Sequence, residues 1–260
     1  MNYTQLYQAI QAFAENFDDS QGGFIQNIPV FVQNAEQRIY NSVQLPALRR
    51  NSLGNTTASN PYLSAPDDFL SSFSLAVIDP VTNEYSYLLN KDVNFMRASY
   101  PKQSYTGKPK YYAIFGSQYS FPNELSFILA PTPDASYQVE LNYYYYPVTI
   151  VQGVVDSYNG FTGGSGYVDG YYENVPLTGG TGTNFIADFN VVGNSVQSIT
   201  IKNGGSFYSV GDILGVDPVN LGGTGSGFSI TVTNISNPNG TSWLGDNFDT
   251  VLLYGALVEG

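Results

Sequence analysis

Two pairs of neighbouring acids, Asp18-Asp19 and Asp67-Asp68, are the first residues whose types and spacing could do chemistry. Glycoside hydrolysis needs two carboxylates about 5 to 10 Å apart. Neighbouring residues in a strand point apart, and both pairs lie in turn-like, solvated contexts, so we do not expect a glycosidase. Asp246 and Asp249 could ligate calcium, but their spacing lacks the alternation of an EF-hand loop. We therefore predict helix capping there, with Asp246 or Asn247 as the cap and Asp249 in the first turn.

Histidine and cysteine are both missing from the 260 residues. Their absence excludes the Ser-His-Asp triad, cysteine nucleophiles, imidazole proton transfer, Cys/His zinc sites, iron–sulfur clusters and disulfides. We therefore predict that the protein is not an enzyme and holds no cofactor and no metal.

Two Gly-Gly-Thr-Gly sequences, Gly179–Gly182 and Gly222–Gly225, are similar to a phosphate-binding loop. Such a loop ends in Lys followed by Ser or Thr at the start of a helix. Here the second motif runs into Phe228 and a strand-like stretch, with no Lys nearby. Turn glycines are the favoured interpretation.

The charge balance is strongly acidic, with 9 Lys and Arg against 21 Asp and Glu, a net charge of −12. A general nucleic-acid binder needs clustered cations, so this composition disfavours one. Arg49-Arg50, with Arg38 upstream, is the densest basic region. Two interpretations of these three residues remain. They pair with acidic residues at a subunit boundary, which is favoured, or they contact DNA phosphate. Lys108 and Lys110 flank Pro109 on an expected exposed loop and serve solubility.

The first forty residues are expected to form two short amphipathic helices separated by a glycine-containing turn. One apolar face is formed by Leu6, Ala9, Ile10, Phe13 and Phe17, with Thr4 as N-cap and an end near Asp18. After a turn over 18–23, a second stripe runs through Ile28, Phe31, Val32, Ala35 and Ile39, with Pro29 early in the helix.

Alternating patterns from Ala47 to about Pro147 predict strands. Segment 79–84 indicates a hairpin between Phe73–Ile78 and Tyr85–Leu89, and a short helix ends before Pro101. Further strands are expected at Tyr111–Phe115, Glu124–Leu129 and Tyr137–Tyr146.

Between residues 157 and 236 the sequence contains an internal repeat of about 41 to 43 residues. Each copy leads into a strand-like stretch, Phe185–Val192 in the first and Phe228–Ile235 in the second. Helical spacing returns after Ser242.

These elements predict an α+β fold in three parts. Residues 1–44 and 241–260 form a small helical bundle, 45–150 a β-rich body, and 157–236 an inserted, Gly-rich, sandwich-like β domain with a two-fold internal repeat.

The chain has 22 Tyr and 16 Phe but only 12% charged residues, a bias typical of large partner-covered surfaces. The longest apolar run, Val251–Val258, is too short to span a bilayer, and no cation precedes Arg38, so neither a membrane helix nor a secretory signal is expected.

An ordered series of segments resembles the head-to-tail adaptor proteins of tailed, mainly short-tailed, bacteriophages, also called tail tubular protein A-like or head completion proteins. The segments cover about 1–150 and 241–260; they are Phe31–Tyr40, Leu45–Asn51, Leu88–Phe95, Gly107–Ala113, Leu129–Tyr137 and Thr241–Asp246. At the C-terminal end the chain departs from the resemblance, because adaptors of this type carry a longer helical tail that reaches towards the portal.

The resemblance implies a virion structural protein of the neck or tail, assembled in the host cytoplasm. It implies a homo-oligomeric, dodecameric ring that joins the portal protein to the tail nozzle protein, contacts tail fibres in some cases, and lets double-stranded DNA pass without specific binding. An acidic channel wall agrees with this, because it repels phosphate. The alternative is a fibre or receptor-binding module whose Gly/Tyr-rich repeat recognises host glycan.

Overall fold

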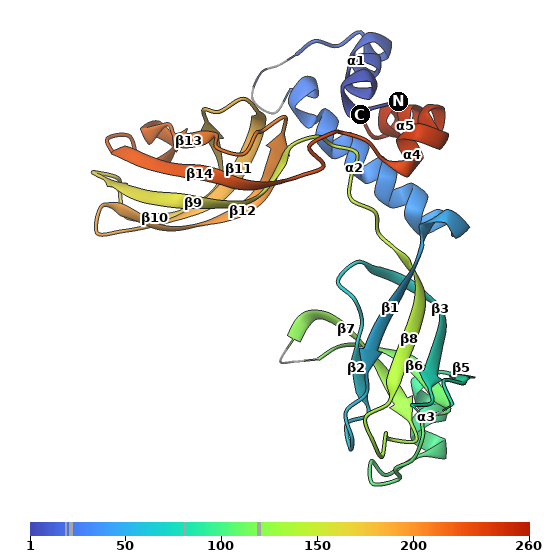
Figure 1. Cartoon of the computed structure of the whole chain (residues 1–260). Coiled ribbons are helices and arrows are strands. Elements are labelled where there is room, and N and C mark those ends of the chain that lie inside the picture. The colour runs from blue at the N-terminus through green and yellow to red at the C-terminus, as the bar shows by residue number, and fades with distance from the viewer. Residues whose placement is uncertain (19, 21–22, 81, 119–120) are drawn as a thin grey trace. The chain divides into compact units, whose positions relative to one another are not determined.

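The chain is a mixed α+β protein in which strands dominate, which confirms the predicted class. The structure, a computed structural model, describes residues 1–18, 20, 23–80, 82–118 and 121–260. It divides into two compact units (Figure 1): the first unit is Met1–Ile39 with Val148–Gly260, and the second unit is Tyr40–Pro147. The three-part division, the helical bundle and the inserted sandwich stay predictions. In the described part of the chain, no helix combines the length and apolar character needed to cross a bilayer.

Two N-terminal helices form where the apolar spacing predicted them, α1 (Tyr3–Ala14) and α2 (Phe24–Ser42). The N-cap of α1 is Asn2 and not Thr4, because the Asn2 and Gln5 side chains each accept the other's backbone N–H. This helix ends at Ala14, short of Asp18, since Glu15 adopts a left-handed conformation (φ 51°).

The predicted apolar face of α1 is only partly correct, because Leu6 and Ile10 are buried whereas Phe13 and Phe17 are exposed. Pro29 lies inside α2, beyond the first turn where it was expected, because the helix already begins at Phe24. The predicted turn over 18–23 lies partly outside the described residues.

The C-terminal segment forms two helices, α4 (Trp243–Asn247) and α5 (Asp249–Glu259). The predicted cap at Asp246 or Asn247 is wrong: Ser242 caps α4, and Phe248 precedes α5 without a side-chain bond. Asp249 does lie in the first turn of α5, as predicted. Close packing with α2 depends on Gly255, where an added Cβ would lie 3.2 Å from the Ala35 Cβ.

The Gly-rich segment of the first unit forms one six-stranded antiparallel sheet in the order β12-β11-β10-β13-β14-β9 (Figure 1). The two predicted strands are confirmed as parts of β11 and β14. The bounds are β9 (Val154–Ser165), β10 (Gly170–Thr178), β11 (Thr183–Val192), β12 (Ser195–Ser206), β13 (Ile213–Val216) and β14 (Ser226–Ser236), with a 3₁₀ turn at Pro218–Leu221. The edge strands β9 and β12 meet, because Gly163 lies against Val196 and Gly204 against Val155.

Each half of this sheet supplies a tyrosine that covers a glycine of the other half. The buried ring of Tyr167 lies on Gly225, and the buried ring of Tyr208 lies on Gly182. The hydroxyls of the two motif threonines make matching bonds, Thr181 to the Phe207 carbonyl at 3.1 Å and Thr224 to the Gly166 carbonyl at 2.9 Å. The two Gly-Gly-Thr-Gly segments are therefore packing sites, where a side chain larger than hydrogen would occupy the space of a ring.

The second unit is built from two four-stranded sheets and one helix. One sheet has the order β1-β8-β3-β4 and the other β2-β7-β6-β5. The predicted strands and the β3–β4 hairpin are confirmed, except that the predicted strand Tyr85–Leu89 is split: its first part is β4, and Leu89 begins β5 in the other sheet. Val81 in the hairpin turn lies outside the described residues. The bounds are β1 (Arg49–Asn55), β2 (Tyr62–Ser64), β3 (Phe69–Ile78), β4 (Tyr85–Tyr87), β5 (Leu89–Asn90), β6 (Tyr111–Gln118), β7 (Phe121–Ala130) and β8 (Gln138–Tyr145), with a 3₁₀ turn at Pro46–Leu48.

These two sheets enclose a core that includes Leu75, Phe127 and Leu141. The predicted short helix, α3 (Val93–Ser99), covers the other face of the β2-β7-β6-β5 sheet, where Met96 packs on Ala113, Ile128 and Ala130. The layers are thus sheet, sheet and helix. Within this unit, nothing among the described residues forms a layer on the outer face of the β1-β8-β3-β4 sheet.

We predict that Gly225→Ala and Gly182→Ala each destabilise the first unit, by about 1–3 kcal/mol, because the added methyl group overlaps a buried tyrosine ring. Trp243 is the single tryptophan and lies in the first unit, so its fluorescence during urea unfolding reports the loss. Gly215→Ala is the control, since its added Cβ would lie 3.7 Å from the nearest atom. Equal unfolding midpoints for all three variants would contradict the packing described.

Candidate interaction surfaces

The three predicted site arginines lie in different settings. Arg38, on α2 of the first unit, forms an ion pair with Glu259 and donates to the Gly255 carbonyl at 3.4 Å, so it ties α2 to α5. Arg49 and Arg50 are neighbours at the start of β1 in the second unit and point to opposite faces of its sheet. The sequence gives no signal for this division of roles.

Arg50 faces the inner side of the sheet. Its guanidinium lies 2.6 Å from an Asp68 carboxylate oxygen and 3.7 Å from the centre of the Tyr145 ring. Asp68 also accepts a bond from the Tyr143 hydroxyl at 2.7 Å. The prediction of a solvated Asp67-Asp68 pair is therefore wrong for Asp68, which is half-buried and holds two partners, while Asp67 is exposed. Burial and the Asp68 bond raise the pKa of Tyr143 to about 12.

Arg49 faces the outer side of the same sheet. Its guanidinium lies 4.1 Å from the centre of the Phe73 ring and 5.5 Å from that of Tyr144. Among the ion pairs of the described residues, none includes Arg49. A cation held only by rings is available to an outside acid or phosphate.

We call the outer face of the β1-β8-β3-β4 sheet the open face. The strand register pairs Leu53 with Glu140, Ala76 with Tyr87, and Ile78 with Tyr85, so these side chains share that face. Four large apolar or aromatic side chains on it are more than half exposed: Leu53 (62%), Phe73 (53%), Tyr85 (51%) and Tyr87 (66%). Exposed apolar side chains gathered on one face are typical of surfaces that bind a partner.

Three polar groups on the open face have no hydrogen-bond or ion-pair partner of the kinds given below among the described residues. The Arg49 Nε and the Asn142 Oδ1 are buried and make no hydrogen bond to a described residue. Glu140, half-buried on β8, forms no ion pair among the residues that the structure describes. Each orphaned buried polar atom costs about 1–3 kcal/mol, so the face is suited to receive complementary groups.

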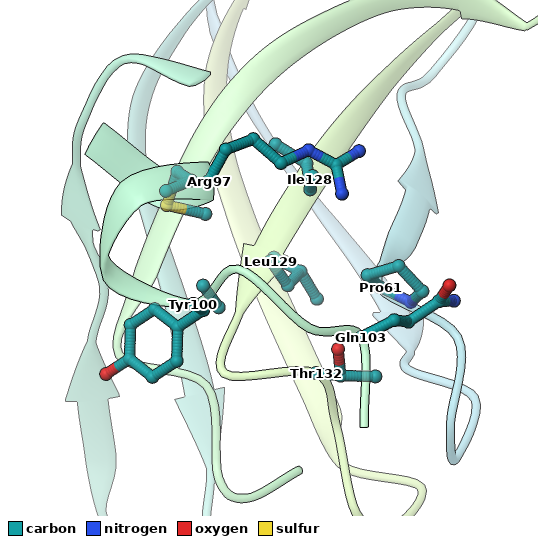
Figure 2. Close-up of a pocket in the computed structure, with 9 residues that line it drawn as sticks. Pro61, Arg97, Tyr100, Gln103, Ile128, Leu129 and Thr132 are labelled. Carbon is teal, nitrogen blue, oxygen red and sulfur yellow. The ribbon is translucent and has the colours of Figure 1, made fainter. Parts of the chain in front are cut away.

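The hollows of the second unit are shallow or small. Figure 2 shows one small hollow of this unit, which is lined by Arg97 of α3, Gln103 of the following loop and Leu129 of β7. Its volume is about 20 Å³, enough for about one water molecule. A wider hollow of about 360 Å³ lies between Tyr87, Leu89 and the Lys108–Tyr111 segment. Lys108 is half-buried there and its Nζ donates to Ser86 Oγ at 2.9 Å, which corrects its expected exposure.

A buried carboxyl group joins α2 to the segment that enters the Gly-rich sheet. Glu36 is 3% exposed and accepts bonds from Thr149 Oγ1 at 2.5 Å and the Ile150 N–H at 2.9 Å. Burial raises the pKa of Glu36 to about 7, against the lowering effect of these two bonds. Nearby, Tyr3 of α1 lies with its ring centre 5.1 Å from that of Phe207, so the helices and the sheet meet around apolar and acidic groups. Sequence reasoning missed Glu36, since it sits among polar neighbours on the sequence.

In the part of the chain that the structure describes, no three acidic side chains gather in a way that could hold a metal ion. The prominent features are exposed apolar and charged surfaces, which are typical of proteins that contact other macromolecules. Residues 1–162 match the family model of the SU10 adaptor protein, which is more than half of the chain. The chain therefore belongs to this family of bacteriophage adaptors, and as such is a component of the virion. No curated protein matches it.

We predict that Glu36 makes the stability of the first unit fall as the pH rises. Folded Glu36 keeps its proton up to about pH 7, while the unfolded carboxyl loses it near 4.5, so stability declines between these values and is constant above. The slope approaches at most about 1.4 kcal/mol per pH unit. The chain has no His, so no other side chain ordinarily titrates in this window.

Glu36→Gln should remove this slope, because its amide oxygen still accepts a bond but carries no titrating proton. The slope is measured by urea unfolding at several pH values from about 5 to about 7, with Trp243 fluorescence as the signal of unfolding. Glu15→Gln, at an exposed position, is the matched control and should keep the slope. An unchanged slope in Glu36→Gln would show that another group is responsible.

Proposed function

We propose that this chain is the head-to-tail adaptor of a tailed, short-tailed phage. In this proposal copies form a dodecameric ring in the neck, between the portal protein and the tail nozzle protein, and DNA leaves through the ring. The observation that carries the proposal is the match to the SU10 adaptor family over 1–162, which includes the whole second unit. The open face supports it, because a ring gives each copy a neighbour to cover Leu53, Phe73, Tyr85 and Tyr87.

The distribution of charge supports a channel that does not hold DNA. The first unit contains 13 Asp and Glu against two Lys and Arg, a net charge of −11. Both of its cations are already engaged, Arg38 with Glu259 and Lys202 with Asp188. Such a surface repels phosphate, so DNA passes without specific binding. Arg49, on the open face, is then a subunit contact and not a phosphate contact.

We further propose that the protein acts without catalysis and that tail fibres are its remaining partners. The acids that stand out have structural tasks: Asp68 holds Arg50, and Asp188 accepts from Tyr171, Asn174 and Lys202. None of these carboxylates lies with a second one in a deep cleft among the described residues.

The alternative, a glycan-binding module in the Gly-rich sheet, has less support. Sugar recognition by stacking needs exposed aromatic rings. In this sheet Tyr167 and Tyr208 are 1% and 3% exposed, and Tyr158 and Tyr172 are half-buried. Tyr171 (61%) and Phe161 (38%) have exposed rings. The Phe161 ring packs edge-on against Phe228, and the Tyr171 hydroxyl is bound to Asp188 at 3.0 Å. A glycan array with the full chain separates the two functions, because strong selective binding would favour the alternative.

We predict that the purified chain forms a ring, alone or on purified portal protein, and that Leu53→Ser with Tyr87→Ser prevents ring formation. These side chains are exposed, so their loss removes contact area between copies with little effect on the fold. Native mass spectrometry and negative-stain imaging measure the assembly. Asn51→Ser, a polar position on the same face, is the control. A wild-type chain that stays monomeric even with portal protein would contradict the proposed function.

A further inference from the structure

The cations of this acidic protein are concentrated in one short segment. The second unit has seven of the nine Lys and Arg residues and eight acids, a net charge of −1. Five of these cations lie between residues 91 and 110, together with a single acid, Asp92. That acid is engaged as the N-cap of α3, where it accepts the Phe95 N–H at 2.9 Å. The segment around α3 is therefore a basic region within an acidic chain.

We call the outer surface of this helix the α3 face, formed by Lys91, Phe95, Arg97 and Phe115. Lys91 and Arg97 are exposed, and each lies near a ring: Lys91 Nζ is 5.4 Å from the Phe95 centre, and Arg97 Cζ is 5.8 Å from the Phe115 centre. Neither cation forms an ion pair with a described residue. Both rings are 36% exposed, so the face combines unpaired positive charge with apolar area.

The open face and the α3 face lie on opposite outer sides of the three-layered second unit. Strands β1, β8, β3 and β4 form one outer layer, and α3 lies beyond the second sheet. The open face presents the Glu140 carboxylate beside exposed Leu53, and the α3 face presents Arg97 and Lys91; none of the three charges is in an ion pair with a described residue. The Arg97 guanidinium donates one hydrogen bond to the Tyr62 hydroxyl at 3.4 Å.

The Glu140 carboxylate is complementary in charge to Arg97 and Lys91, and each surface has exposed apolar side chains to bury. The cation of the open face, Arg49, lies four residues from the β1 position that pairs with Glu140, over the Phe73 ring.

We propose that the open face of one copy docks on the α3 face of a second copy, with Glu140 placed against Arg97 and Lys91. This inference rests on the proposed ring. A contact between two identical faces closes at two copies, whereas a contact between two different faces continues from copy to copy, and it gives a ring when the rotation from each copy to the next closes. The partner is a second copy and not DNA, because a chain of net charge −12 repels a phosphate backbone.

Charge reversal on either face tests the contact in the full chain. Glu140→Arg brings like charges together at every interface, and so does Arg97→Glu. Each variant alone should therefore assemble roughly tenfold or more weakly than the wild type. An equimolar mixture of the two should recover rings, because alternating copies present opposite charges at each contact. Native mass spectrometry gives the fraction of chain in rings, and circular dichroism confirms that each variant is folded.

Matched single charge reversals away from both faces are the controls. Asp67→Arg and Lys102→Glu are exposed positions that change the net charge by the same amounts, and they should assemble as the wild type does. Normal assembly of Arg97→Glu, or no recovery in the mixture, would overturn the proposed contact while leaving the ring itself intact. A wild-type chain that forms no ring would overturn the proposed function, and this contact with it. Binding of a DNA duplex that is lost in Arg97→Glu would likewise count against a protein partner.

Discussion

The fold of the second unit depends on one constraint: a sheet must bury one face, and here the second face is left apolar as well. The inner face of the β1-β8-β3-β4 sheet packs on the second sheet through residues such as Leu75 and Leu141. Its outer face keeps Leu53, Phe73 and two tyrosines in solvent, and it leaves polar atoms of Arg49 and Asn142 without a partner. A stable monomer gains nothing from this arrangement, whereas an assembly covers the apolar area and satisfies the polar atoms.

The first unit combines rigidity with negative charge. Reciprocal tyrosine–glycine packing holds the two halves of the Gly-rich sheet together, and Glu36 with Thr149 and Ile150 connects α2 to the segment that leads into it. A hydrogen bond from a backbone N–H group lowers the pKa of Asp188. For Asp212, burial raises the pKa but hydrogen bonds from Ser209 and Thr181 lower it by more, so both carboxyl groups favour the charged form. The unit therefore carries a net charge of −11, which repels phosphate.

Local structure was largely predictable from the sequence, and the interaction surfaces were not. The periodicity of Leu6 and Ile10 and the alternation over 137–146 gave α1 and β8, because each pattern reflects burial along one element. The N-cap of α1 was missed because more than one residue near its start can accept a backbone N–H. Thr4 has a suitable hydroxyl, but Asn2 and Gln5 each accept the other's backbone N–H and so fix the start of the helix. Arg49 and Arg50 are the same residue type at neighbouring positions. Yet the Arg49 guanidinium lies over the rings of Phe73 and Tyr144, whereas that of Arg50 forms an ion pair with Asp68. That difference, like the placement of Arg49, Glu140 and Tyr87 on one face, arises from strand register between distant segments, which no local pattern encodes.

The central claim is that the open face is covered when the protein is assembled. Hydroxyl-radical footprinting of the free chain and of the chain in intact virions measures this directly, because oxidation follows the exposure of individual side chains. The account predicts strong protection of Leu53, Phe73, Tyr85 and Tyr87 in the virion, with unchanged labelling at Tyr171, which is exposed on the Gly-rich sheet. Equal labelling of the four open-face residues in the two states would contradict it.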